Sequence, residues 1–291
     1  MLLRRSWTRR SAVAAVLAAG GAGVVACAPP AAVRSYASAS GEVAGRFPVL
    51  AADIPASCAR AEGYRALAED KEWWDDGALA ERCKTLNDAA PALLAANRAL
   101  QQYLGALAAM ADDRVVRFDP QLDALARAVV ATNEFPRERV EAVGGLTALL
   151  ARAATDGYRR AQLRDAIAEA NDDVQAITDG LVLVVDRAYL LTLHNERAAL
   201  DRFYVKAIKE GRTEEPLTAL LVLERRDDRL ATLRDRRLAA QAYVSALRSV
   251  ARGHRRLYES RERLNARELL AELADYAVAI ETLAADIRKS F

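Results

Sequence analysis

Histidine and cysteine are scarce in this sequence, and their scarcity limits the chemistry that the protein can perform. The 291 residues contain two histidines, His194 and His254, and three cysteines. A metal site on two helical histidines would need acidic residues at spacings such as Glu-x-x-His, and neither position provides one. The sequence also contains no Cys-x-x-Cys pair, no nucleophile elbow and no glycine-rich phosphate loop. We therefore expect no catalytic residue, metal or cofactor, and predict that the protein is not an enzyme.

Aromatic residues, glycine and proline are also few, which argues against a sheet-rich fold. Hydrophobic residues nevertheless make up 52% of the chain, mostly as Ala and Leu, and charged residues make up 28%. Abundant Ala, Leu, Arg and Glu with few β-branched residues favour helix. The sequence therefore predicts an all-α protein, an elongated antiparallel helical bundle with coiled-coil-like seams.

An excess of positive charge is missing once the two parts of the chain are separated. Four of the 42 basic residues lie among the first 26 residues, which contain no acid. Residues 27–291 then hold 38 basic and 40 acidic side chains. A nearly neutral chain gives no electrostatic reason to bind nucleic acid, and we exclude that class of partner.

The N-terminal segment has the parts of an export signal. Residues 1–10 are basic, and residues 11–26 are uncharged and rich in Ala, Gly and Val. This apolar run is too short for a membrane span but is typical of a signal peptide. It ends in the sequence VVAC at Cys27, which resembles the lipobox of bacterial lipoproteins. The resemblance covers the first 27 residues and implies cleavage after Ala26 and lipid attachment to Cys27.

A lipid anchor would place the protein at a membrane of the cell envelope. Several acyl chains such as palmitate, each methylene adding about 0.8 kcal/mol, would hold it durably. In this family an Asp after the cysteine commonly retains the protein at the inner membrane. Ala28 stands there instead, so the resemblance favours the outer membrane, with the chain facing the periplasm. Two alternatives stay open: an ordinary secretory signal cut elsewhere, and twin-arginine export, for which Arg9-Arg10 is a poor match.

The rest of the chain divides into a linker and a folded part. Residues 27–48 are rich in small residues, Gly, Pro and Ser and show no periodicity, which is typical of a flexible tether. The alternative is a segment that packs on the surface near Phe47. Residues 49–291 are predicted to form a single helical-bundle domain.

Two cysteines remain when Cys27 carries lipid. In an oxidising compartment Cys58 and Cys83 are expected to form a disulfide. The spacing raises one difficulty: a helical hairpin turning at residues 73–77 would place the two cysteines roughly 13 Å out of register. The bond therefore requires a turn nearer residue 70 or a shorter first helix.

Three segments carry apolar stripes at alternating steps of three and four residues, the spacing of one helix face. The stripes are Leu93, Asn97, Leu100, Leu104, Leu107 and Ala111; Leu230, Leu233, Arg237, Ala240, Val244, Leu247, Ala251, His254 and Tyr258; and Ala266, Leu269, Leu273, Tyr276, Ile280, Leu283 and Ile287. We expect His254, within the second stripe, to be a hydrogen-bonded interior residue and His194 to lie at the surface or at a seam between helices.

Breaks between helices are also readable. Asp119-Pro120 is a good helix start, residues 133–136 end that short helix, and the loop expected before it covers residues 113–118. Residues 211–216 indicate a turn between two further helices. Residues 137–210 contain no proline, so either one long helix or two consecutive helices fit, with any bend expected at Gly144-Gly145.

Three features could provide contact surfaces. Residues 181–193 are apolar nearly all round, which indicates a central buried helix or a docking surface for a partner. Trp73-Trp74 either closes the end of the bundle or forms a contact patch. Residues 225–267 hold thirteen arginines and five acids. These arginines either pair with acids on neighbouring helices or form a basic face for an anionic partner, densest at Arg252, Arg255, Arg256, Arg261 and Arg263.

Together these patterns predict a lipid-anchored, non-catalytic helical scaffold or adaptor that contacts another envelope protein. The alternative is a binding module that holds an apolar or anionic small molecule or lipid between its helices. A cavity lined by residues 181–193 would favour this alternative.

Overall fold

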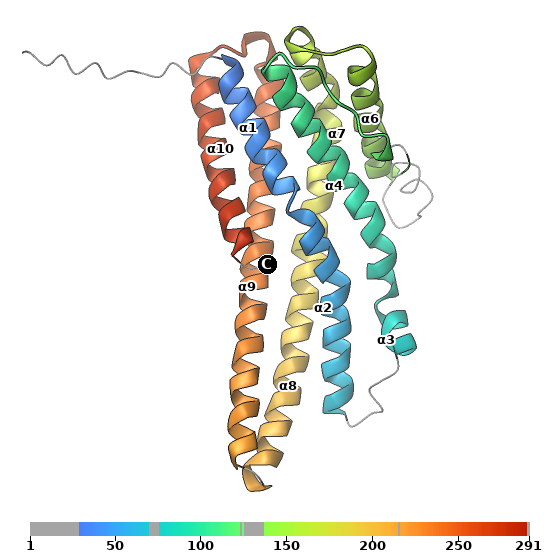
Figure 1. Cartoon of the computed structure of the whole chain (residues 1–291), viewed down its shortest axis with the longest axis vertical. Coiled ribbons are helices and arrows are strands. Elements are labelled where there is room, and N and C mark those ends of the chain that lie inside the picture. The colour runs from blue at the N-terminus through green and yellow to red at the C-terminus, as the bar shows by residue number, and fades with distance from the viewer. Residues whose placement is uncertain (1–28, 70–75, 123, 125–136, 215, 290–291) are drawn as a thin grey trace, which may run out of the picture.

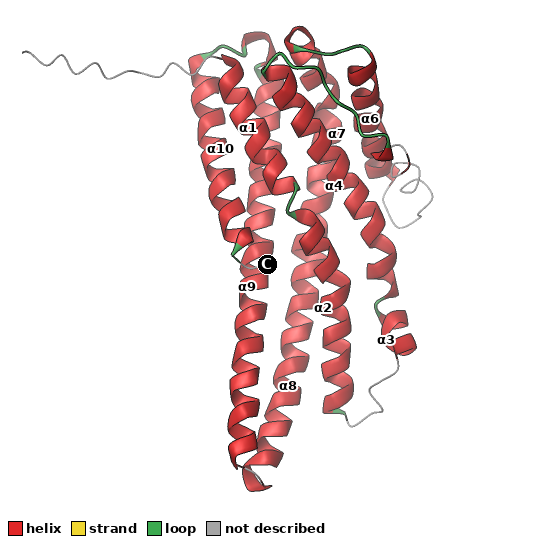
Figure 2. Ribbon diagram, in the orientation of Figure 1, coloured by secondary structure: helices red, strands yellow, loops and turns green. Residues whose placement is uncertain are grey.

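The computed structural model describes residues 29–69, 76–122, 124, 137–214 and 216–289. Every regular element in these ranges is helical and none is a strand (Figure 2), which confirms the predicted all-α fold. Residues 1–26 with Cys27, and the pair Trp73-Trp74, lie outside the described residues. The predictions made for them therefore stay predictions.

Nine α-helices build an elongated bundle from the described residues (Figure 1). They are α1 (Pro29–Ala44), α2 (Phe47–Ala68), α3 (Asp76–Arg82), α4 (Lys84–Ala111), α6 (Arg137–Thr155), α7 (Leu163–Leu183), α8 (Leu190–Glu214), α9 (Pro216–Glu259) and α10 (Arg267–Arg288). The 44 residues of α9 correspond to a length of about 66 Å. Helices α8 and α9 form an antiparallel hairpin whose tip extends past α2, whereas α10 covers only the other half of α9 (Figure 1).

The prediction of a flexible tether over residues 27–48 is wrong for residues 29–48. Residues 29–44 form α1, which packs against α4 and α10, and Phe47 begins α2. Val33, Tyr36 and Val43 are almost completely buried. Their spacing is helical, but most of the other buried positions of α1 are alanines. Small residues bury little area each, so their stripe is weak in the sequence, yet they let neighbouring helices approach closely.

The three predicted apolar stripes form much of the core. The six residues of the stripe between 93 and 111 are all at least 96% buried. Leu269, Leu273, Ile280 and Ile287 are buried along α10. The stripe of α9 is buried at Leu233, Ala240, Val244, Leu247 and His254, half-buried at Ala251 and Tyr258, and exposed at Arg237. One hydrophobic cluster extends from α1 to α10, so helix periodicity predicted these faces correctly.

Residues 137–214 form two consecutive helical stretches, and the break lies at Gly157 rather than at Gly144-Gly145. Gly157 has a φ of +65°, which favours glycine. The Tyr158 N–H donates to the Ala153 carbonyl, the long bond of a Schellman helix end. Gly145 lies inside α6, at a position where an added Cβ would collide with the Asp173 carboxylate of α7. The turn predicted over residues 211–216 falls late in that range, since α8 continues to Glu214.

The apolar segment 181–193 is central but not buried all round. Leu181, Val185, Tyr189 and Leu193 are buried, whereas Leu191 is 56% exposed. These buried residues recur at steps of four, which would drift around a regular α-helix. Residues 184–189 form a π-helical turn, η2, whose wider turn keeps that spacing on one face.

The predicted disulfide between Cys58 and Cys83 is present, with Cα atoms 6.0 Å apart. Helix α2 ends at Ala68, ten residues after Cys58, and Cys83 lies between α3 and α4. The register difficulty is resolved because the first helix ends before residue 70, as the bond required.

Candidate functional site

The five arginines singled out in the sequence lie at the end of α9 and in the turn that follows it, and most of them contact groups of their own chain. Arg256 forms a two-pronged pair with Glu272 of α10, with nitrogen–oxygen distances of 2.6 and 3.1 Å. Arg255 donates to Gln175 of α7. Each of the other contacts is local: Arg252 donates to Ser249, and Arg261 donates to the Tyr258 carbonyl and stacks on its ring.

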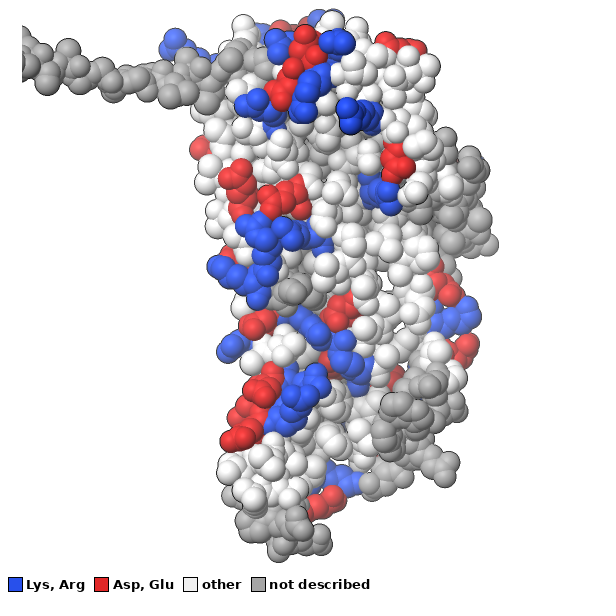
Figure 3. Space-filling model, in the orientation of Figure 1, with Lys and Arg blue, Asp and Glu red and all other residues white. Residues whose placement is uncertain are grey.

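Arg263 is the exception within this group, being exposed and without a partner among the described residues. Figure 3 shows basic and acidic side chains alternating down the α9–α10 side of the molecule rather than forming a basic face there. Among the arginines of residues 225–267, Arg226, Arg236, Arg248 and Arg256 pair with carboxylates of other elements. Pairing with acids of neighbouring helices, the simpler of the two interpretations, describes Arg256 among the five. Arg252, Arg255 and Arg261 instead contact neutral groups of their own chain.

A network of paired charges connects α2, α8 and α9 inside the bundle. Glu196, which is 3% exposed, accepts hydrogen bonds from Arg60 and from the Ser57 hydroxyl. Asp53 pairs with Arg60 at 3.0 Å and with Arg236 at 3.5 Å. Two carboxylates and two guanidinium groups therefore compensate one another. Sequence analysis missed this network because its members are far apart in the chain.

The π-helical turn adds Tyr189 to this network. The Tyr189 hydroxyl donates to Asp53 over 2.6 Å. Burial, and then the neighbouring Asp53 carboxylate, raise the pKa of Tyr189, so the phenol keeps its proton and acts as the donor. The two positive and two negative charges balance, and the geometry of the network fits a role in fixing the register of three helices.

The two histidines lie where the sequence placed them. His194 is exposed, and His254 is completely buried with its Nε2 2.8 Å from the Tyr103 hydroxyl. Burial lowers the pKa of His254 to about 3, so the ring is neutral at physiological pH. The described residues contain no cluster of three metal-ligating side chains. Within the same ranges, none of the helices combines the length and apolarity that crossing a membrane requires.

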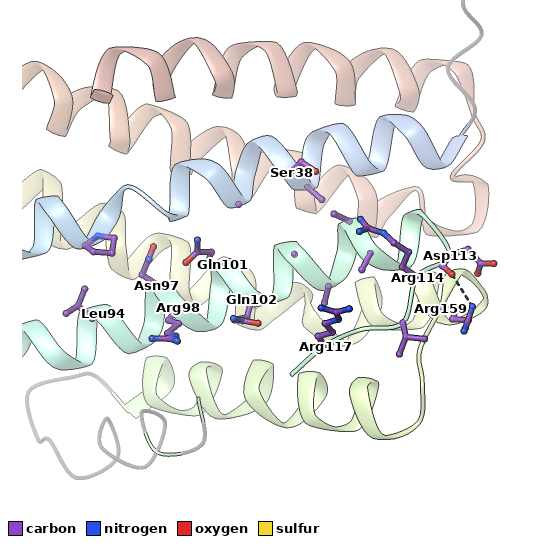
Figure 4. A pocket seen from close by; sticks show the side chains of 18 residues that line it. Ser38, Leu94, Asn97, Arg98, Gln101, Gln102, Asp113, Arg114, Arg117 and Arg159 are labelled. Atoms are coloured by element: carbon purple, nitrogen blue, oxygen red, sulfur yellow. Dashed lines mark hydrogen bonds between the residues drawn. The ribbon is translucent and has the colours of Figure 1, made fainter. Parts of the chain in front are cut away.

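A groove of about 1350 Å³ follows the outer side of α4. Helix α1 and Pro48 of α2 form one wall, and residues 113–117 form the other (Figure 4). The α4 part of the lining extends from Leu94 to Ala109. By comparison, the two pockets that residues 182, 184 and 188 help to line measure about 170 and 190 Å³. Those are below the roughly 300 Å³ at which ligand sites begin.

The second wall of the groove follows from how α4 ends. Asp113 has a φ of +59°, which Asp tolerates better than most residues. The Arg114 N–H donates to the Ala109 carbonyl and the Asp113 N–H to the Met110 carbonyl, a Schellman end. The chain reverses there, and residues 114–119 form the predicted loop beside the helix.

Asp119 then fastens this loop to α4. Its carboxylate accepts the Gln121 N–H at 3.0 Å, as a helix-capping residue does, and also pairs with Arg98 of α4. The Gln121 hydrogen bond, and then that of Arg98, lower the pKa of Asp119. The helix start predicted at Asp119-Pro120 therefore has the capping bond, although most of the helix expected after it lies outside the described residues.

Small side chains form the floor of the groove. They are Gly105 and Ala109 of α4, and Ala37 and Gly41 of α1 are small residues of the adjoining wall. A Cβ added to Gly105 would meet nothing within 4 Å, so the space above this helix position is open. At the two ends of the groove, Leu94 is 36% and Val115 is 42% exposed. The groove thus combines a flat floor with exposed apolar side chains.

Charge in the groove is predominantly positive. The lining contains four arginines, Arg98, Arg114, Arg117 and Arg159, and a single acid, Asp113. Figure 4 shows Arg98, Gln102 and Arg117 on the same side of α4, with Arg114, Asp113 and Arg159 gathered at the helix end.

These four arginines differ in how far their own chain engages them. Arg114 pairs with Asp112 at 3.1 Å, and Arg159 donates to the Asp113 carbonyl. Arg117 is exposed and has no partner among the described residues. Sequence reasoning missed this site because its arginines are dispersed over 62 positions. The reversal at Asp113 places Arg114 and Arg117 beside α4, and Arg159 comes from the segment between α6 and α7.

No protein-family description, curated protein or solved structure matches the chain.

Proposed function

We propose that this chain is the precursor of a bacterial lipoprotein whose helical bundle works without catalysis, as a scaffold or adaptor that binds another envelope protein. Its anchor would be the lipid on Cys27, and it would face the periplasm, at the outer membrane in preference to the inner. The observation that carries the interaction is the groove along α4, with four arginines and one acid in its lining. An open, positively charged surface with exposed apolar side chains has the character of a protein-binding site.

The alternative, a module that holds a small molecule or lipid between helices, has weaker support. The pockets beside residues 181–193 are small, and Tyr103, Tyr189 and Tyr243 fill the interior with fully buried rings. The groove lies outside the helix core and is larger than the usual 300–1000 Å³ of an enclosed ligand pocket.

The anchor is tested by labelling cells with palmitate and fractionating their membranes. We expect the wild-type chain to carry label and to sediment with membranes, and Cys27→Ala to lose both properties. An unlabelled wild-type chain that is released as a soluble protein would contradict the lipoprotein assignment.

The interaction is tested by placing a photo-crosslinking amino acid at Gln102, in the groove, or at Val278, which is 64% exposed on α10. In intact cells we expect one envelope protein to be captured from Gln102 and not from Val278. Capture of the same proteins from both positions, or of none from Gln102, would overturn the proposal.

A further inference from the structure

We propose that the groove along α4 binds an extended, acidic segment of the partner protein. This inference rests on the proposed function, because it specifies the chemistry of the partner that the groove would receive. The length, charge and orientation of the groove favour a peptide segment over a lipid surface or a small anion.

The length of the groove fits a short extended peptide. Its α4 lining extends from Leu94 to Ala109, a rise of about 22 Å along the helix. An extended chain advances about 3.3 Å per residue, so about seven residues would cover that distance. The floor at Gly105 and Ala109 has almost no side chain, which lets a peptide backbone lie close to the helix.

The charges specify an acidic peptide. Arginine side chains occur at both ends of the groove and along its side rather than converging on one point (Figure 4). A single phosphate or carboxylate could reach only a subset of them, whereas successive acidic side chains could reach several. The groove's own acid does not compete strongly, because the Asp113 carboxylate already accepts the Arg160 N–H at 3.3 Å. Among the arginines of the lining, Arg117 is the one whose side chain has no partner in the described ranges, so its donors can bind a carboxylate.

The exposed apolar residues add a second requirement. Pro48 and Leu94 lie at one end of the lining and Val115 toward the other. Successive side chains of an extended peptide point in opposite directions. A segment in which acidic residues alternate with small apolar ones would therefore present carboxylates to the arginines and methyl groups to the apolar side chains.

The orientation of the groove argues against a lipid surface as the ligand. The ion pair between Arg34 and Asp112, 2.9 Å long, places the end of α4 beside the first part of α1. If Cys27 carries lipid, this end is the one nearest the membrane. Arg98 is thirteen residues before Ala111, the end of α4, hence about 20 Å farther away. A flat membrane at the N-terminal end would touch Arg114 and leave Arg98 beyond reach.

The direct test measures binding of a fluorescent eight-residue peptide that alternates Glu with Ala or Val. The protein is the full chain carrying Cys27→Ala, so that an attached lipid does not contribute to binding. The controls are the same peptide with Lys in place of Glu, inorganic phosphate as a competitor, and vesicles of phosphatidylethanolamine with phosphatidylglycerol.

Two pairs of variants test the location. Arg117→Glu is matched by Arg263→Glu, because both arginines are exposed and lack partners among the described residues. Gly105→Leu is matched by Gly144→Leu, because an added Cβ meets nothing within 4 Å at either helical glycine. Leucine favours helix over glycine, so neither glycine variant should unfold the protein.

We expect the Glu peptide to bind and the Lys peptide not to bind. Arg117→Glu and Gly105→Leu should each weaken binding by about tenfold or more, while Arg263→Glu and Gly144→Leu leave it unchanged. Equal affinity for both peptides, equal effects within each matched pair, displacement by millimolar phosphate, or Arg117-dependent binding to vesicles alone would each overturn the inference. If crosslinking from Gln102 still captures a protein in those cases, the proposed function stands and only the acidic peptide is excluded.

Discussion

Arginine side chains are paired differently in the interior of the bundle and in the groove along α4. Inside, Arg60 and Arg236 meet Glu196 and Asp53, so that two positive charges face two negative ones. Along the groove, Arg98 and Arg114 pair with acids at the surface, and Arg117 has no partner among the described residues. Charge is costly in the interior unless it is compensated, whereas water can solvate it in the open groove. The comparison indicates which arginines serve the fold and which are available to a ligand.

The largest effect should follow from breaking a pair inside the bundle. Glu196→Ala removes the acceptor of both Arg60 and Ser57, which are left partly or fully buried. We expect the free energy of unfolding to fall by about 3 kcal/mol, measured by denaturant titration. Glu272→Ala removes an exposed partner of Arg256 and serves as the control, with a much smaller loss. Equal losses of unfolding free energy in the two variants would show that burial does not make the Glu196 pair more important than the Glu272 pair.

The next effect is a pH dependence caused by a buried group that has no charge partner. The pKa of His254 is about 3 in the folded protein because of burial, against about 6.5 when unfolded. Below pH 6.5 the His254 ring becomes protonated in the unfolded chain but stays neutral in the folded protein. The free energy of unfolding therefore falls with falling pH until about pH 3. Each unit in this window costs at most about 1.4 kcal/mol. Between pH 7 and 5, His254→Gln should reduce the slope of stability against pH, and parallel curves for the two proteins would contradict this assignment.

A smaller effect of opposite sign is expected at Asp173, a half-buried acid of α7. Burial, and then the neighbouring Asp172 and Glu169, raise the pKa of Asp173 to about 6. Because the folded state holds its proton more tightly than the unfolded chain, the ionised group destabilises the fold at pH 7, and this cost disappears as pH falls below about 4. Asp173→Asn should therefore stabilise the protein at pH 7 by about 1 kcal/mol, after allowing for solvent screening. Thermal unfolding of the two proteins at pH 7 and pH 4.5 measures this stabilisation, which should be smaller at the lower pH.

The smallest effect on stability should come from the groove itself. Arg117→Ala removes an exposed side chain without partners, and we expect the unfolding free energy to change by less than about 0.5 kcal/mol. A loss as large as that of Glu196→Ala would mean that Arg117 serves the fold, and the contrast between interior and groove would fail.

Helix patterns predicted most of the architecture but not the candidate site. The stripes of α4, α9 and α10 were readable because large apolar residues recur on one face. Helix α1 was missed because its stripe consists mainly of alanine with Val33, Tyr36 and Val43 between them. The arginines singled out in the sequence were the most concentrated ones, yet Arg256 pairs with Glu272 and Arg255 with Gln175. A high local concentration of arginines in the sequence therefore did not indicate which of them are free to bind a ligand.

The sequence by itself determined the helical class, the apolar faces of the main helices and the pairing of Cys58 with Cys83, because each depends on local spacing or on counting residues. Only the tertiary structure decided which charges are compensated, because the partners of Arg60 and Arg236 lie on other helices. It also decided where the groove lies. The positive φ of Asp113 reverses the chain against α4 and brings Arg114 and Arg117 into the same hollow as Arg98 and Arg159. A reversal at one residue thus assembled a surface that no contiguous segment of the sequence contains.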